Sequence, residues 1–238
     1  MKSQHLCRSS LKIRHKIQPE AMANSARDNI LASVKSALAH PRDQAPARPD
    51  LVSPLYAREK GKDPVLVFAE NFSARKSVFF YSESMEEFRQ QITTYLAERK
   101  FRQIFIWEKE LAEELANCHI QFATGDRNLT EIECGITLCE CLVERTGSIM
   151  VSSRQGAGRR LSIYPPVHMV VASVSQILPD IKDALAFMKK KYGQRLPSMI
   201  SMVTGASRTA DIEKTLVMGA HGPKELILFL IDDAKADA

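Results

Sequence analysis

The sequence lacks the features that would place it in a membrane or outside the cell. Its 238 residues hold no apolar run near the ~20 residues that a membrane-spanning helix requires, and the run ELILFLID has only the length of a strand. The first 21 residues lack the apolar core and cleavage site of a secretory signal. Five cysteines, an odd number, without such a signal favour reduced thiols. We therefore expect a cytoplasmic protein with no membrane span.

Signatures of common cofactors are missing as well. The chain has neither G-x-G-x-x-G after a strand nor G-x-x-x-x-G-K-[ST], so no nucleotide cofactor has a local motif. Cys134 and Cys139 have the first spacing of a plant-type iron–sulfur motif, C-x4-C-x2-C. Only one residue separates Cys139 from Cys141 instead of two, and the surrounding run is apolar. No CxxC or histidine pair has the spacing of zinc ligands. We expect no metal and no evident cofactor in this chain, and we expect these cysteines to be buried.

Basic residues are concentrated at the N-terminus rather than on a domain surface. The net charge is +5, yet residues 1–21 contain five lysines and arginines against one glutamate, which leaves 28 basic and 27 acidic residues in the remainder. Nucleic-acid binding needs a clustered basic face on the folded domain. The distribution therefore predicts no nucleic-acid partner and a disordered leader over residues 1–21.

The chain divides by composition into an arm and a main body. Residues 25–39 place apolar side chains at helical spacing, and Pro41, Pro46, Pro49 and Pro54 follow, where proline blocks helix formation. We predict an N-terminal helix and a proline-rich strap over residues 22–54, and one α/β domain over residues 55–234.

The main body alternates between strand-length apolar runs and helical patterns. Helices are expected at 84–100, 108–118 and 178–193. Strands are expected at 64–72, 76–81, 102–107, 120–124, 134–143, 147–153, 160–164, 167–173, 198–203 and 226–231. This alternation predicts a Rossmann-like α/β fold with a mainly parallel sheet.

The segment TGASRTADIEKTLVMGAHGP, residues 204–223, concentrates polar side chains directly after a predicted strand. Gly205 permits a tight turn, Ser207 and Thr209 can donate hydrogen bonds, and Arg208 can hold a carboxylate or phosphate through two parallel bonds. The alternative is that Ser and Thr only cap a helix while Arg208 pairs with Asp211. A complete helix over 209–218 would separate its ends by ~14 Å, so only a short helix or a segment that doubles back brings His221 to the loop.

A second loop, SSRQGAGRR at residues 152–160, offers two glycines and three arginines between predicted strands. Arg154, Arg159 and Arg160 could bind an anion. The pattern favours a flexible hairpin loop with solvated charges.

The segment from Thr204 to Asp232 resembles the C-terminal signature of the LutC/YkgG family, whose members carry a LUD (lactate utilisation) domain. The matching positions are Gly205, Ser207, Arg208, Thr209, Ala210, Asp211, Ile212, Glu213, Gly219, His221, Gly222 and Pro223. Upstream, CECLVERTGSIMVSS is similar to a family segment at Thr146 and Gly147, and LSIYPPVHMVVA is similar to another at Pro166 and His168. Many relatives have Ala-Glu where this chain has Glu144-Arg145.

The resemblance implies a fold like that of sugar-phosphate isomerases and CoA transferases, and a role in oxidising L-lactate to pyruvate. It implies iron–sulfur clusters in two partner proteins rather than in this chain, and a small carboxylate or other anionic ligand. The candidate groups for proton transfer are Asp211, Glu213 and His221. The candidate ligand-binding residues are Gly205, Ser207, Arg208, Thr209, Thr146, Gly147, His168 and Gly222.

Two other functions stay open at this point. The chain can be a non-catalytic assembly or metabolite-sensing subunit, since oxidising lactate needs an electron acceptor and no flavin, nicotinamide or cluster motif is evident. An isomerase or CoA-transfer activity rests on fold analogy alone. The identity of the ligand, the electron acceptor and the oligomeric state are left open by the sequence.

Overall fold

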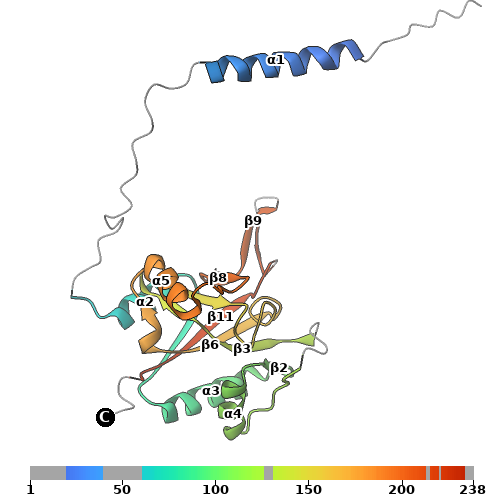
Figure 1. Ribbon diagram of the computed structural model, residues 1–238. Helices are drawn as coiled ribbons and strands as arrows, with labels where there is room; N and C mark the ends of the chain where they lie inside the picture. The colour runs from blue at the N-terminus through green and yellow to red at the C-terminus, as the bar shows by residue number, and fades with distance from the viewer. Residues whose placement is uncertain (1–19, 40–60, 126–130, 213–214, 220, 234–238) are drawn as a thin grey trace, which may run out of the picture. The chain divides into compact units, whose positions relative to one another are not determined.

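The computed structural model describes residues 20–39, 61–125, 131–212, 215–219 and 221–233, with the backbone alone for residues 20–25 and 209–218 (Figure 1). The chain divides into two compact units, residues 1–56 and 57–238. In the first unit, helix α1 spans Glu20–Ala39, so it begins two residues inside the predicted leader. The rest of that leader and the predicted proline-rich strap lie outside the described residues. Among the described residues, no helix is both long and apolar enough to cross a membrane.

The second unit is built on a five-stranded parallel sheet in the order β1-β11-β6-β3-β2. Its strands are β1 (Val78–Ser82), β2 (Ile104–Ile106), β3 (Cys134–Leu138), β6 (Val167–Ser173) and β11 (Glu225–Ile231). The inner strands read as continuous apolar runs because both faces of a parallel sheet are covered. The predicted α/β class with a mainly parallel sheet is confirmed.

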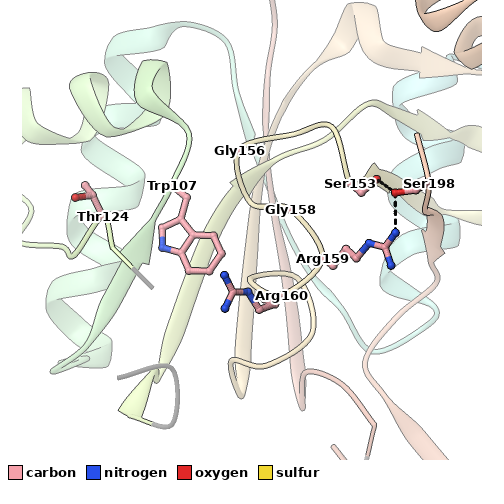
Figure 2. A pocket seen from close by; sticks show the side chains of 8 residues that line it. All are labelled: Trp107, Thr124, Ser153, Gly156, Gly158, Arg159, Arg160 and Ser198. Carbon is pink, nitrogen blue, oxygen red and sulfur yellow. Dashed lines mark hydrogen bonds between the residues drawn. The ribbon is translucent and has the colours of Figure 1, made fainter. Parts of the chain in front are cut away.

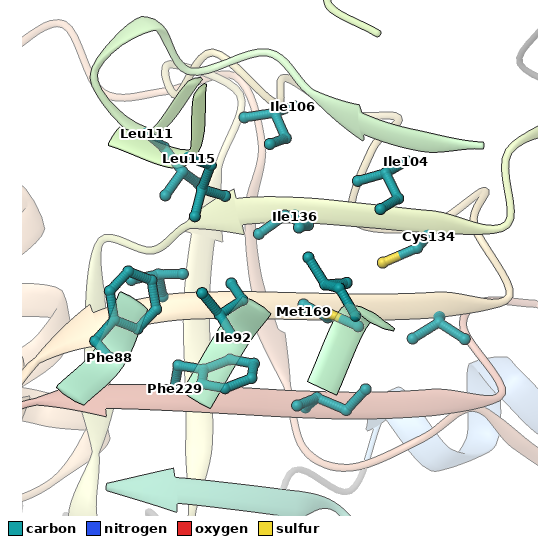
Figure 3. Packing of buried hydrophobic residues seen from close by; sticks show 14 of the residues in the cluster. Phe88, Ile92, Ile104, Ile106, Leu111, Leu115, Cys134, Ile136, Met169 and Phe229 are labelled. Atoms are coloured by element: carbon teal, nitrogen blue, oxygen red, sulfur yellow. The ribbon is translucent and has the colours of Figure 1, made fainter. Parts of the chain in front are cut away.

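Helices α3 (Met85–Arg99) and α4 (Lys109–Asn117) cover one face of this sheet (Figures 1 and 3). Ser84 caps α3, since its hydroxyl accepts from the Glu87 amide at 3.2 Å. Phe229 of β11 lies at the centre of the contact and stacks on Phe80 with a ring-centroid distance of 4.7 Å. The apolar side of each helix therefore faces the sheet, and the charged side faces solvent.

The opposite face of the central sheet packs against helix α2 (Pro64–Ser73) and a second sheet, which the sequence did not predict. The second sheet has the order β7-β4-β5-β8. Its strands are β4 (Cys141–Val143), β5 (Ser148–Ser152), β7 (Ile177–Leu178) and β8 (Ile200–Val203). The short helix η2 (Glu144–Thr146) joins β4 to β5, and η3 (Val174–Gln176) joins β6 to β7. Helix α5 (Ile181–Tyr192) packs on its other face through Ala184 and Met188.

Residues 64–72 form helix α2, so the predicted strand is wrong. The Asp63 side chain accepts a hydrogen bond from the Val65 amide at 2.8 Å, and Pro64 occupies the first turn, where its missing N–H costs nothing. Phe68 and Phe72, four residues apart, are both fully buried on one side of the helix. The aromatic and β-branched residues suggested a strand, whereas the cap and the four-residue spacing determine a helix.

Two further predicted strands are also absent from the described structure. Residues 120–124 contribute only an isolated bridge between Ala123 and Phe105. Residues 160–164 form turns that carry the chain into β6. The bridge lies on β2, the edge strand of the central sheet, so the first run extends the sheet by one residue pair only.

The three central cysteines are buried, as predicted, and lie in separate hydrophobic clusters. Cys134 packs under α3 and α4, Cys139 packs beside α2, and Cys141 faces α5. Burial raises the pKa of the Cys141 thiol to about 12 and raises the pKa values of the other two as well. These thiols are therefore protonated packing groups at neutral pH.

Candidate functional site

Two segments that match the family motifs, residues 144–147 and 204–207, meet at one end of the second sheet. Strands β5 and β8 are antiparallel, with Ile149 opposite Val203. Residues 144–147 precede β5 and residues 204–207 follow β8, so the antiparallel pairing places both loops at the same edge. The candidate site is therefore formed by segments about 60 residues apart in the chain.

A chain of three hydroxyl groups links these loops. The Ser148 hydroxyl donates to Thr146 Oγ1 at 2.7 Å and lies 2.7 Å from Thr204 Oγ1. Because a hydroxyl has one proton to donate, the Thr204 hydroxyl is the donor in the second bond. Ser148 is fully buried, whereas Thr204 is exposed. The chain thus fixes the Thr204 side chain at the surface from a buried anchor.

Gly147 allows helix α2 to pack directly on the first loop. Its φ is +58°, and a Cβ atom there would lie 2.4 Å from the Phe72 amide nitrogen and 2.5 Å from the Asn71 carbonyl carbon. The Asn71 side-chain amide donates to the Glu144 carbonyl at 3.0 Å. Gly147 therefore acts in this structure through close backbone packing, since a side chain would require α2 to move.

Gly205 has the same role in the second loop and brings two arginines together. Its φ is +81°, and a Cβ atom there would lie 2.9 Å from Arg75 Cβ. The Arg208 guanidinium donates from Nη2 to the Arg75 carbonyl oxygen. Both arginines are exposed, and the exposed Thr204 hydroxyl precedes Gly205. Arg75, Thr204 and Arg208 together are called the arginine rim below.

The two halves of the 204–223 motif meet because the segment between them is a β-hairpin. Strands β9 (Arg208–Ile212) and β10 (Thr215–Met218) are antiparallel, so the loop continues into a strand. The Ser207 amide donates to the Pro223 carbonyl at 2.8 Å, and the Gly219 amide donates to the Ser207 carbonyl at 3.0 Å. Gly222 packs against Ser207, where a Cβ atom would lie 3.3 Å from that of the serine.

The hairpin places the candidate residues unequally. His221 is exposed at the base of the hairpin, beside Gly222. Thr209 and Asp211 lie in β9, but their side chains are outside the described structure, and so is the whole of Glu213. The alternative in which Arg208 pairs with Asp211 therefore stays open, and the roles of Asp211, Glu213 and Thr209 stay predictions.

His168 lies inside the fold rather than on the arginine rim. It is fully buried near the start of β6, and its Nε2 is 2.9 Å from Thr137 Oγ1. Its Nδ1 has no hydrogen-bond partner among the described residues. Burial lowers the pKa of His168 from its ordinary 6.5 to about 4, so the ring is neutral at physiological pH.

This shift predicts a pH dependence of stability between about pH 4 and 6.5. The unfolded chain binds a proton there and the folded chain does not, so stability is complete above 6.5 and falls as the pH decreases. The contribution approaches about 1 kcal/mol per pH unit. In His168→Asn, the unfolding free energy measured with urea should change less steeply with pH in this window. An unchanged slope would show that His168 titrates normally in the folded protein.

Sequence reasoning missed three residues of this site. Ser148 and Thr204 stand inside the quoted motifs, but only their neighbours were selected. Arg75 was missed because residues 64–72 were predicted as a strand. The polar residues 73–76 that follow were then assigned to no helix and to no site. A helix prediction from the Asp63-Pro64 cap would have placed Arg75 at the C-terminal end of α2.

Comparisons with known proteins agree on the family. The family model described as LUD domain matches residues 65–231. Lactate utilization protein C of Bacillus licheniformis is 34% identical over 116 residues, covering 47% of this chain and 48% of that protein. The uncharacterized protein YkgG of Escherichia coli is 32% identical over 116 residues, so this chain spans about half the length of both relatives.

Two longer matches extend over most of the chain. An uncharacterized protein of Neisseria meningitidis is 29% identical over 225 residues, covering 87% of this chain and 94% of that protein. A crystal structure of a DUF162 family protein from Deinococcus radiodurans aligns with a TM-score of 0.54 and 16% identity, covering 71% of this chain and 96% of that one, and it supports the fold alone. The chain belongs to the LUD domain family, within its LutC/YkgG relatives.

Proposed function

We propose that this protein takes part in lactate utilisation and binds a small carboxylate at the arginine rim. The names of several relatives support the process, since they are called Lactate utilization protein C. The observation that carries the binding role is the approach of Arg208 to Arg75 across Gly205. Two arginines and the Thr204 hydroxyl form an exposed donor-rich surface, which suits a carboxylate.

The fold prepares this surface before any ligand arrives. The Arg208 guanidinium is held by the Arg75 carbonyl, and the Arg75 stem packs on Gly205. Lys224 adds a third positive charge near the hairpin base, because its side chain packs against Gly219. An anion therefore meets donors whose positions are already restricted, which lowers the entropic cost of binding.

The remaining chemistry is also part of the proposal. His221 is exposed at the hairpin base and, with Asp211 and Glu213, is a candidate for proton transfer. Electrons removed from lactate would pass to iron–sulfur partner proteins.

The second candidate function is that of a subunit that binds the metabolite without catalysis. Lactate-dependent dye reduction by the chain alone, and then with the partner proteins, separates the two.

Replacing Arg208 tests the binding role directly. Arg208→Ala should weaken L-lactate binding about ten- to a hundredfold in calorimetry, because a charge-assisted contact is worth about 1.5–3 kcal/mol. Arg208→Lys should restore only part of the affinity, since an ammonium lacks the planar fork of donors. Arg195→Ala removes another exposed arginine and serves as the matched control. An Arg208→Ala protein with a lower melting temperature and normal lactate affinity would refute the proposal, as would a wild-type protein that binds no lactate.

A further inference from the structure

A pocket with a volume of about 720 Å³ is lined by residues other than those of the arginine rim (Figure 2). Its size falls within the roughly 300–1,000 Å³ typical of small-molecule sites. The residues that line it come from the loop after β5, the segment before β8, the end of β2 and the segment after α4. The polar and aromatic members are Trp107, Thr124, Ser153, Arg159, Arg160 and Ser198.

The position of Trp107 in the sheet is where α/β proteins bind ligands. Trp107 directly follows the carboxyl end of β2. The connection after β2 is α4, on one face of the central sheet, whereas the connection after β3 is the second sheet, on the other face. A crevice opens outside the carboxyl ends of neighbouring strands whose connections leave to opposite faces. Trp107 lines the pocket at this point of the sheet.

The loop that carries the arginines is fixed against the end of β2. The buried Glu108 carboxylate accepts a hydrogen bond from the Ala157 amide at 3.1 Å. A Cβ atom on Gly156 would lie 3.0 Å from the Trp107 carbonyl oxygen, so a side chain there would require the loop or the end of β2 to shift by a few tenths of an ångström. Ala157 is buried in a small cluster with Phe105. The loop predicted to be flexible is therefore anchored at its centre.

The pocket combines anion-binding groups with an aromatic surface. The Arg159 guanidinium donates to the Ser198 hydroxyl at 2.6 Å, and the Ser198 and Ser153 hydroxyls are 3.1 Å apart (Figure 2). No carboxylate of the described residues pairs with Arg159. On the other side, the Arg160 guanidinium lies 5.4 Å from the centre of the Trp107 ring. One end of the pocket thus suits an anion, and the other end suits a planar ring.

We propose that this pocket binds a phosphorylated ligand with a planar ring, the chemistry of a nucleotide. Arg159 with the Ser153 and Ser198 hydroxyls holds the phosphate, because guanidinium and hydroxyl groups donate to its oxygens. The ligand's planar ring stacks on the Trp107 ring or on the Arg160 guanidinium, as bases stack on aromatic and guanidinium planes. This site is separate from the arginine rim, so its test does not depend on lactate binding.

The experiment uses Trp107 as its own reporter, because it is the single tryptophan of the chain. AMP should change the tryptophan fluorescence saturably, while adenosine or inorganic phosphate alone binds at least about tenfold more weakly. Arg159→Ala should weaken AMP binding about ten- to a hundredfold, and Ser198→Ala should weaken it several-fold. Arg154→Ala is the matched control, since Arg154 is an exposed arginine of the same loop and does not line the pocket.

Each result decides the proposal. Fluorescence unchanged by AMP, ADP and ATP at millimolar concentration overturns it. Phosphate that binds as tightly as AMP overturns the role of the ring, and adenosine that binds as tightly overturns the role of Arg159. Because Arg159 is exposed, we expect Arg159→Ala to keep the wild-type circular dichroism and melting temperature. If it unfolds, Ser198→Ala and Arg159→Lys provide the same comparison in a folded protein.

Discussion

Gly147→Ala should destabilise the protein by about 2–5 kcal/mol in urea or thermal unfolding. A left-handed backbone costs a residue with a Cβ about 1–2 kcal/mol, and overpacking costs about 1–3 kcal/mol more. Overpacking is unavoidable here, because the new atom would meet the backbone of α2 at the Phe72 amide, and backbone cannot rotate away as a side chain does. The substitution should also weaken lactate binding, since α2 leads into Arg75.

Gly158 provides the matched control for this substitution. Its φ is +59°, nearly the same as the +58° of Gly147, but a Cβ atom there meets nothing within 4 Å. Gly158→Ala should therefore show the backbone cost alone, about 1–2 kcal/mol. Equal losses in the two variants would mean that α2 does not pack on residue 147 as the structure describes.

Glu140→Ala should cost about 3–5 kcal/mol of unfolding free energy, as removal of one partner from a buried ionic network does. The Glu140 side chain is fully buried, and its carboxylate accepts three hydrogen bonds. Lys191 Nζ and the Tyr192 hydroxyl donate to it at 2.7 Å each, and the Ser152 hydroxyl donates at 2.5 Å. The carboxylate ties β4 to β5 and α5, so its loss leaves three donors without their acceptor.

The acid dependence of stability identifies the charge as the cause. Burial by itself raises the pKa of Glu140, but the bonds from Lys191, Ser152 and Tyr192 outweigh it and hold the pKa below its ordinary 4.5. The stabilisation is thus present above pH 4.5 and is lost as the pH falls through the lower folded value. Glu140→Gln should keep the shape and lose this acid-dependent part. Glu113→Gln is the control. The Glu113 side chain is 67% exposed and pairs with Lys109, so its replacement should change the unfolding free energy by less than about 0.5 kcal/mol.

The fold was predictable wherever a local pattern was unambiguous. Helix α3 was predicted over 84–100, because periodic apolar residues are a local signal, and Ser84 caps it. The pattern failed at residues 64–72, where aromatic and β-branched residues resemble a buried strand, and the deciding Asp63-Pro64 cap was overlooked. That one error removed Arg75 from the predicted site. A wrongly predicted element therefore also hides the candidate residue at its end.

The sequence by itself determined the family motif, the parallel α/β sheet and the two glycine-containing loops that carry candidate ligand-binding residues. Only the tertiary structure decided that residues 144–148 and 204–208 touch, that Arg75 joins Arg208, and that Trp107 faces Arg160. The physical reason is the range of the interactions. Periodicity, caps and turns depend on neighbours within a few residues, whereas the β5–β8 register and the contacts at Gly147 and Gly205 depend on backbone segments that only folding brings within van der Waals distance.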